Sequence, residues 1–352
     1  MTYYSSLSPE DIHFLLSKGY MKTINIIIDH KGGGGAEYIA ESIHTFLLKN
    51  RKNLNCRLIV LSDKNTLLFR QFKWLWLVLF FFKNRSDAYF TLHEHIGLFS
   101  SVFSSIVGFQ HVHYEANNFM IKKNGSLKLK IIYFLLYKFA AKFNKSILTA
   151  CSAELCDIVE SITSKKCSNL GVCVNIEIVK INSTFNKDKN KFLFIGRCVD
   201  QKNPLLAAKS LKTLRDKGAK TVFCGVGPLI VDVLKIYNGE HRDHCPLDVL
   251  IIPGDVVIVT SHYEGYPTLI PRVIALGASV ITTTFSTGLN ELKDVFINQI
   301  YIVNNPSDMA SRMLDLYNCD YKNISRGSIV EKDIFDQYSV SSFVDRLGRL
   351  YL

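Results

Sequence analysis

The segment Ser261–Gly277, SHYEGYPTLIPRVIALG, follows a run of β-branched residues, Val256–Val259. The run has the composition of a buried strand, and the segment continues through an exposed Glu264 and a turn at Gly265–Pro267 into a helical apolar pattern. Helix N-termini favour phosphate, and a carboxylate accepts hydrogen bonds from hydroxyls, so this arrangement suits a sugar nucleotide. A strand, a loop and a helix with a glutamate of no special role would show the same pattern.

Strand and helix patterns alternate on both sides of this segment, which predicts α/β layers with parallel sheets. Lys22–Asp29 is a buried strand that leads into a glycine loop and an amphipathic helix, and the pattern starts again at Lys191–Arg197, KFLFIGR. The polar stretch Ile181–Asn190 has little to bury and is the best linker between the two halves. We therefore expect two α/β domains, over 1–182 and 183–332, with a cleft between them. Further expected strands are 56–61, 87–93, 110–114, 146–150 and 221–224, and further expected helices are 65–82, 127–143 and 204–217.

The composition is that of a globular protein with a surplus of positive charge. The chain has 352 residues, with a formal net charge of +11, which suggests an anionic partner. No zinc-finger spacing or RNA-binding aromatic signature accompanies the charge, so we expect no nucleic acid partner. The nine cysteines are scattered and read as reduced thiols, and no secretory signal pattern opens the chain. We therefore expect a cytoplasmic protein.

Five motifs, in a consistent order, carry a resemblance to a known family. They are SNLGVCV (168–174), FLFIGRCVDQKN (192–203), TVFCGVGPL (221–229), GDVVIVTSHYEG (254–265) and STGLNEL (286–292). Together they resemble glycosyltransferase family 4, whose members are retaining enzymes with the GT-B fold, two facing Rossmann-like domains. The resemblance implies a nucleoside-diphosphate-sugar donor, no cofactor, and a final helix over 333–352 that packs back on the first domain. Many members build bacterial surface polysaccharide, including lipopolysaccharide.

Arg197 and Lys202 flank a turn after a strand, and both can point at one diphosphate. Cleavage of a sugar–phosphate bond requires that the developing charge on the leaving diphosphate is neutralised. The resemblance likewise assigns these two residues to the donor diphosphate. The loop Gly32–Gly35 also suits a phosphate, and the same pattern fits an NAD(P) oxidoreductase with Asp63 as the ribose-binding acid. However, its glycines form a plain run, and Asp63 lies 28 residues beyond Gly35 instead of about 20.

Two histidines flank the expected strand in FQHVHYE. His113 lies nearer the carboxyl end of the strand, and the family commonly places a histidine there, near the reacting sugar. Strand alternation puts His111 on the same face, one step farther away. Either histidine could instead be a core residue without a role in the site. A zinc site formed by these two with His93 and His95 has no support from cysteines or spacing.

The family's acidic motif is incomplete here. The family has a glutamate, seven residues and a second glutamate, whereas Arg272 occupies the second position counted from Glu264. The resemblance implies that the first glutamate contacts the transferred sugar and the second the ribose. A guanidinium group only donates, so Arg272 indicates either altered donor recognition or a catalytically degenerate partner subunit. The expected catalytic residues are Arg197, Lys202, Glu264 and His113, and the expected donor-binding residues are Gly34, Gly35, Gly225, Gly227, Gly265, Tyr266, Thr268, Arg272 and Glu291.

The acceptor side is less well specified. The chain has no Asp-x-Asp motif, so we expect no metal. Glu115, Asn117 and Asn118 follow the His113 strand and are expected to contact a glycan or lipid-linked acceptor. The segment Lys122–Lys145 is a basic amphipathic helix that, with Trp74–Phe82, could rest on an anionic membrane at its inner face. A core-facing helix with a solvated lysine face is the alternative. At nine residues, Trp74–Phe82 is too short to span a bilayer, which takes about 20.

Overall fold

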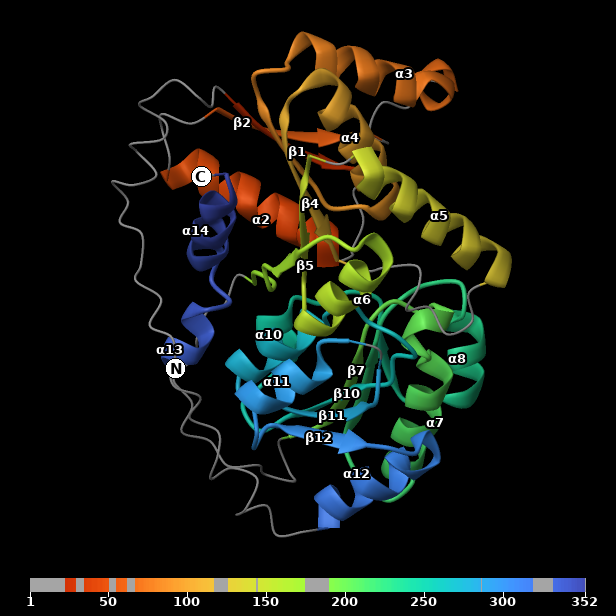
Figure 1. Ribbon diagram of the computed structural model, residues 1–352. Helices are drawn as coiled ribbons and strands as arrows, with labels where there is room; N and C mark the ends of the chain where they lie inside the picture. Colours follow the sequence, from red (N-terminus) through yellow and green to blue (C-terminus); the bar gives the residue numbers. More distant parts are fainter. Residues whose placement is uncertain are drawn as a thin grey trace. The chain divides into compact units, whose positions relative to one another are not determined.

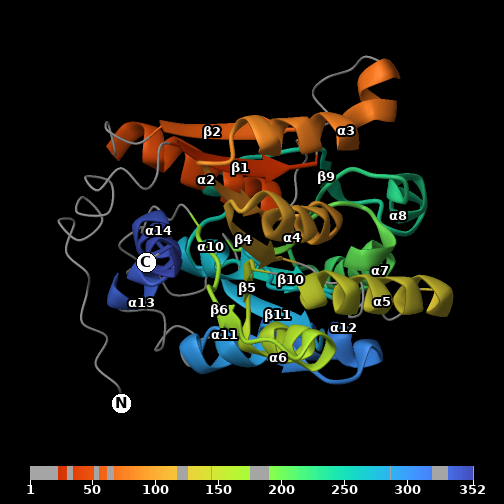
Figure 2. The same ribbon diagram turned by 45° about the horizontal axis from the view of Figure 1, so that its top comes forward.

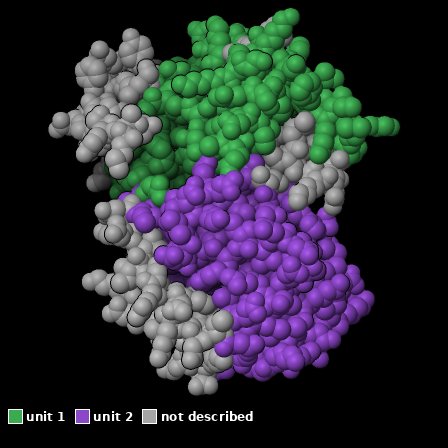
Figure 3. Space-filling view, turned by 60° about the horizontal axis from the view of Figure 1, so that its bottom comes forward, with its two compact units in different colours: residues 1–175, 337–352 green, residues 176–336 purple. Residues whose placement is uncertain are grey.

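The chain forms two compact units, each built on one parallel sheet. The computed structural model describes residues 23–29, 35–50, 55–61, 67–116, 126–143, 145–174, 190–285, 287–318 and 332–351. Unit 1 comprises residues 1–175 and 337–352, and unit 2 comprises residues 176–336 (Figures 1 and 3). The expected linker lies outside the described residues except for Asn190.

The unit 1 sheet has six parallel strands in the order β2-β1-β3-β4-β5-β6. The strands are β1 (Thr23–Ile28), β2 (Asn55–Val60), β3 (Ala88–Thr91), β4 (Gln110–Glu115), β5 (Ile147–Ala150) and β6 (Cys167–Asn169). The helices are α2 (Gly35–Asn50), α3 (Leu67–Lys83), α4 (Glu94–Val107), α5 (Leu127–Phe143) and α6 (Ala153–Thr163). Ile26, Ile27 and Ile28 are fully buried because a parallel sheet is covered on both faces.

Helices cover both faces of this sheet. In sequence order, α3, α4, α5 and α6 each contact the next and form one layer, and α2 lies on the other face (Figures 1 and 2). Strand β4 shows the alternation directly. The ring of His113 lies against Gly97 of α4, whereas the ring of Tyr114 packs edge-on against Phe343 near the C-terminus. Successive strand side chains therefore face opposite helix layers.

The C-terminal segment differs from the single helix expected over 333–352. It forms α13 (Lys332–Asp336) and α14 (Val340–Leu350), because Ser339 caps α14 by accepting a hydrogen bond from the main-chain N–H of Ser342 over 3.1 Å. Helix α14 contacts α2 of unit 1. Tyr351 donates to the main-chain oxygen of Tyr89 over 2.9 Å, which ties the end of the chain to β3.

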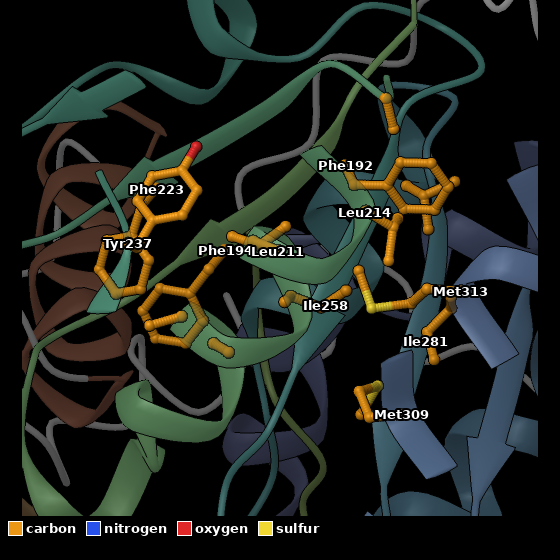
Figure 4. Packing of buried hydrophobic residues seen from close by; sticks show 14 of the residues in the cluster. Phe192, Phe194, Leu211, Leu214, Phe223, Tyr237, Ile258, Ile281, Met309 and Met313 are labelled. Atoms are coloured by element: carbon orange, nitrogen blue, oxygen red, sulfur yellow. The ribbon is translucent and has the colours of Figure 1, made fainter. Parts of the chain in front are cut away.

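The unit 2 sheet has six parallel strands in the order β12-β11-β10-β7-β8-β9. Its strands are β7 (Phe192–Ile195), β8 (Thr221–Cys224), β9 (Glu240–Arg242), β10 (Val256–Val259), β11 (Ser279–Thr283) and β12 (Ile300–Val303). Its helices include α7 (Pro204–Arg215), α8 (Ile230–Ile236), α10 (Leu269–Ala275), α11 (Leu289–Val295) and α12 (Met309–Asn318). Numbered from β7, the order is 3-2-1-4-5-6, that of a Rossmann sheet. Phe192, Phe194, Leu211, Phe223 and Met313 contribute to its core (Figure 4).

Candidate active site

The carboxyl end of the unit 2 sheet has a topological switch point between β7 and β10. From β7 the chain continues to β8 and β9 on one side, whereas β11 and β12 follow β10 on the other side. Open α/β sheets bind ligands outside the carboxyl ends of the strands at such a point. The segments that follow these two strands are 196–203 and 260–268, and they hold Arg197, Lys202 and Glu264.

Lys202 and Glu264 are brought together here from segments far apart in the sequence. The Nζ of Lys202 donates to Oε1 of Glu264 in an ion pair, and the hydroxyl of Ser261 donates to the same oxygen over 2.6 Å. The two charged side chains are 25% and 8% exposed, respectively. Glu264 is therefore mostly buried and not exposed as its sequence pattern suggested, because two donors hold its carboxylate. A fixed carboxylate beside a half-buried ammonium can bind a hydroxyl and an anion side by side.

Two buried threonines fix the main chain around this pair. Thr260 donates to the main-chain oxygens of Lys202 and the next residue, over 2.8 and 3.0 Å. Thr287 donates to the main-chain oxygens of Glu264 and the next residue, over 2.9 and 2.6 Å. Neither threonine was expected from the sequence. In the sequence, only their positions beside or within a motif could indicate this role. Their hydrogen-bond partners are main-chain atoms of other segments, which no local pattern reveals.

The glycines after β7 and β8 allow two loops to pack against each other. A Cβ on Gly225 would lie 1.9 Å from the main-chain oxygen of Gly196, so only glycine fits. Gly227 has a φ of +149°, and a Cβ there would lie 2.7 Å from the main-chain oxygen of Cys198. Loop packing therefore accounts for both glycines, and their contact with a donor stays a prediction.

The other expected donor residues lie on the segments that follow the strands of unit 2. Arg197 is exposed and forms no ion pair with any residue that the structure describes. Tyr266 is 8% exposed and abuts Gly288, where a Cβ would lie 2.8 Å from its ring. Thr268 precedes α10 without capping it through its side chain, and Arg272 is half-buried in that helix.

Two further donor positions belong to the segments after β10 and β11. Gly265 is buried and accepts the hydrogen bond from Thr287, and Glu291 is half-buried in the first turn of α11. Their contact with a donor also stays a prediction.

His113 and Glu115 lie deep inside unit 1. His113 is fully buried, with Nδ1 3.3 Å from the hydroxyl of Thr91 and Nε2 bonded to Oε1 of Glu115. Glu115 is 1% exposed and also accepts from Tyr137 of α5, while its Oε2 has no hydrogen-bond partner among the residues that the structure describes. Contact of either side chain with a sugar would require that it becomes exposed, and these roles stay predictions.

His111 extends the same buried polar chain. Its Nε2 lies 2.9 Å from the Thr91 hydroxyl, and its Nδ1 lies 2.6 Å from the Ser146 hydroxyl. Burial holds the pKa of His111 well below its ordinary value, and the neighbouring His113 lowers it further. The predicted placement of both histidines on one face of β4 is confirmed by their shared contact with Thr91.

Gly35, at the start of α2, is described and exposed, whereas Gly34, Asn117 and Asn118 lie outside the described residues. Within the described ranges, no three His, Cys, Asp or Glu side chains gather in a way that could hold a metal ion. No helix among them is long and apolar enough to cross a bilayer.

Comparisons with known proteins bear on the fold. No family model matches the chain. A 99-residue stretch, 27% of this chain, is 29% identical to a teichuronic acid biosynthesis glycosyltransferase, TuaC of Bacillus subtilis, described as putative. The match spans a quarter of the length of that relative.

Solved structures match over nearly the whole chain. The lipopolysaccharide outer core galactosyltransferase WaaB is 13% identical with a TM-score of 0.63, over 94% of this chain and 99% of its own. Sucrose-phosphate synthase from Thermosynechococcus elongatus is 13% identical with a TM-score of 0.71, over 94% and 98%. HepE of Anabaena, in complex with UDP and glucose, is 12% identical with a TM-score of 0.71, over 94% and 99%. These neighbours are GT-B glycosyltransferases, so the predicted α/β class and GT-B fold are confirmed.

Proposed function

We propose that this chain is a retaining, metal-independent hexosyltransferase of glycosyltransferase family 4. It transfers a sugar from a nucleoside-diphosphate sugar to a glycan or lipid-linked glycan in bacterial surface polysaccharide synthesis. The observation that carries the proposal is the Lys202–Glu264 pair at the switch point of a Rossmann sheet. Similar structures support it, since HepE forms complexes with UDP and with UDP-glucose.

In this proposal, Lys202 and Arg197 neutralise the diphosphate as it leaves. Lys202 supplies a compact charge, and the exposed Arg197 supplies a planar fork that matches phosphate oxygens. Glu264 accepts hydroxyl groups of the transferred sugar, held in place by Ser261. The acceptor hydroxyl attacks the anomeric carbon on the face from which the diphosphate departs, and the departing phosphate oxygen takes its proton. The configuration at that carbon is therefore retained.

Donor binding tests the proposal directly. A thermal-shift panel would include nucleoside mono- and diphosphates, sugar nucleotides and NAD(P). A ligand at 100 times its Kd stabilises the folded form by about 2.7 kcal/mol. We expect a shift with one nucleoside diphosphate and its sugar nucleotide, measured against the midpoint of each ligand-free variant. Lys202→Gln should abolish the shift, whereas Lys209→Gln, an exposed lysine on α7, should keep it.

Other outcomes of the panel have definite meanings. The absence of any shift would reject the active-enzyme proposal and favour a degenerate partner subunit, which Arg272 also suggests. A shift with NAD(P) alone would reject the glycosyltransferase proposal. In Arg272→Glu, which supplies the family's second acid, we expect shifts with sugar nucleotides that the unaltered protein binds weakly.

We propose in addition that α5 lies on an anionic membrane surface. Large apolar side chains project from it into solvent, and Leu135 and Phe139 are 59% and 55% exposed. Exposed lysines accompany them, among them Lys138 and Lys142. Apolar side chains that enter the headgroup region and lysines that meet anionic lipid are the features of an interfacial helix. Such contact would place the protein at the inner face of the cytoplasmic membrane, beside a lipid-linked acceptor.

Sedimentation with vesicles tests the membrane proposal. We expect binding to phosphatidylglycerol-containing vesicles, and weaker binding to pure phosphatidylcholine or at 1 M salt. The double variant Leu135→Ser/Phe139→Ser should bind at least about tenfold more weakly. Ile297→Ser, at a 70% exposed position of unit 2, is the matched control. Equal binding by the double variant and the control would reject α5 as the contact.

A further inference from the structure

The sheet of unit 1 has its own switch point, between β1 and β3. β2 lies beyond β1 on one side, and β4, β5 and β6 follow β3 on the other side. In sheets that begin with the order 2-1-3, ligands bind at the carboxyl ends of these two strands. Asp29 directly follows β1, and His93 and His95 follow β3. From the sequence, His93 and His95 were weighed only for an unsupported zinc site, and Asp29 had no expected role.

Asp29 is the centre of a set of polar side chains at this point. Its Oδ1 accepts from Nζ of Lys73 over 3.1 Å, and its Oδ2 lies 3.3 Å from Nε2 of His95. Its main-chain N–H donates to Nδ1 of His93 over 3.0 Å, so His93 carries its proton on Nε2, which faces Glu37 at 3.5 Å. The pKa of Asp29 lies below its ordinary value, chiefly because of the hydrogen bond with His95, with Lys73 adding to the effect and burial opposing it.

This set of side chains remains accessible to a ligand. Lys73, Asp29 and His95 are 25%, 24% and 39% exposed, so each still presents part of its polar surface to solvent. Aromatic side chains pack beside these groups. The ring of Trp74 meets that of His95 edge-on at 6.1 Å and packs against Phe99 at 4.7 Å. Polar groups that pack against aromatic side chains and stay open to solvent are the features of a binding subsite.

The chemistry of these groups selects the ligand. Asp29 only accepts hydrogen bonds, Lys73 only donates, and His95 can do either. Each carboxylate oxygen has two lone pairs, so Asp29 can accept from a ligand while keeping its present partners. Neighbouring hydroxyls of a sugar both donate and accept, which matches the set. The charges of Lys73 and Asp29 offset each other, so a carboxylate or phosphate on the ligand would gain little net attraction from the set.

We propose that Asp29, Lys73 and His95 form the subsite for the acceptor sugar, and that this sugar is uncharged. The proposal rests on the proposed glycosyltransferase function. It places the acceptor at β1 and β3 instead of at Glu115, whose side chain is 1% exposed.

Sugar binding can be measured by ligand-observed NMR titration with UDP present. The probes are methyl glycosides of glucose, galactose, mannose and N-acetylglucosamine, together with methyl glucuronide as the anionic counterpart of the glucoside. We expect at least one uncharged glycoside to bind, with the glucuronide at least about tenfold weaker than the glucoside. Asp29→Asn and His95→Gln should each weaken binding by about tenfold or more. Asp157→Asn, at an exposed position of α6, should not change it.

The outcomes separate this proposal from the one on which it rests. Each variant also enters the nucleotide panel, where an unchanged donor shift shows that it is folded and retains its donor site. Three results would overturn the proposed subsite. They are a glucuronide that binds as tightly as the glucoside, unchanged sugar binding by Asp29→Asn, and the failure of every uncharged glycoside to bind. The absence of any nucleotide shift in the unaltered protein would instead overturn the proposed function.

Discussion

Gly97 gives a sharp test because helix propensity and packing predict opposite signs for its replacement. The residue lies in the first half of α4, and alanine is preferred to glycine inside a helix by about 0.5–1 kcal/mol. Gly97→Ala would therefore stabilise unit 1 if propensity decided the outcome. However, the new Cβ would lie 1.7 Å from Nδ1 of His113, against the 3.4 Å or more of ordinary contact.

The cost follows from what surrounds the ring of His113. It is fully buried and bonded on both sides, so a retreat from α4 breaks its bond to Glu115. Glu115 is 1% exposed, and a buried polar group that loses its hydrogen-bond partner costs about 1–3 kcal/mol. The overpacking of the added methyl group costs about 1–3 kcal/mol more. After the gain in helix propensity is subtracted, we expect Gly97→Ala to destabilise unit 1 by about 1–5 kcal/mol.

The chain supplies its own reporter for this measurement. Its two tryptophans, Trp74 and Trp76, both lie in α3, so urea unfolding followed by tryptophan fluorescence reports on unit 1. In a His113→Ala background the added methyl group finds space, and the cost of Gly97→Ala should largely disappear. Gly108→Ala is the control for backbone strain, since its φ is +85° and nothing lies within 4 Å of its Cβ. A neutral or stabilising Gly97→Ala, or equal costs in both backgrounds, would refute the packing argument.

Two further perturbations address positions that hold polar networks in place. Thr287→Val removes the hydroxyl that bonds the loop of Glu264, and we expect the free energy of unfolding to fall by about 1–3 kcal/mol and the donor-induced thermal shift to shrink. Thr287→Ser should keep both the stability and the thermal shift of the unaltered protein. Equal shifts in the two variants would contradict this. Because the pKa of His111 is lowered in the folded protein, the unfolded chain binds a proton at low pH that the folded chain does not. The free energy of unfolding should therefore fall as the pH drops below about 6.5, by up to about 1.4 kcal/mol per pH unit. The stability deficit of His111→Asn relative to the unaltered protein should therefore shrink between pH 7 and pH 5, and a constant deficit in urea titrations would argue against a neutral buried His111.

Strong periodic patterns made much of the fold predictable. The expected helix over 127–143 and the strand over 221–224 coincide with α5 and β8. Helix α4 was missed because Ser100, Ser101 and Ser104 are buried on its inner face, where an amphipathic pattern requires apolar residues. Strand β9 was missed because its three residues, EHR, are polar and partly exposed at the sheet edge.

The candidate site was predictable only where a motif marks it. Lys202 and Glu264 each belong to a motif, but their ion pair joins residues 62 positions apart and depends on the order of the strands. Alternation correctly placed His111 and His113 on one face of β4. That α4 and α5 bury this face depends on tertiary packing, including a glycine at position 97, and no local pattern reveals it.

Both units place a lysine–carboxylate pair at the switch point of their sheets, Lys202 with Glu264 and Lys73 with Asp29. Each lysine is 25% exposed, so water or a ligand can reach its ammonium group. A ligand group that draws the lysine away leaves the carboxylate hydrogen-bonded only if the carboxylate keeps another donor. Glu264 keeps Ser261, and Asp29 keeps His95. The second donor allows each carboxylate to stay in position while its lysine turns to a phosphate or a hydroxyl. In the proposed function, the pair in unit 2 serves an anionic donor because the exposed Arg197 adds a second cation, whereas Lys73 and Asp29 offset each other in unit 1 and serve an uncharged acceptor.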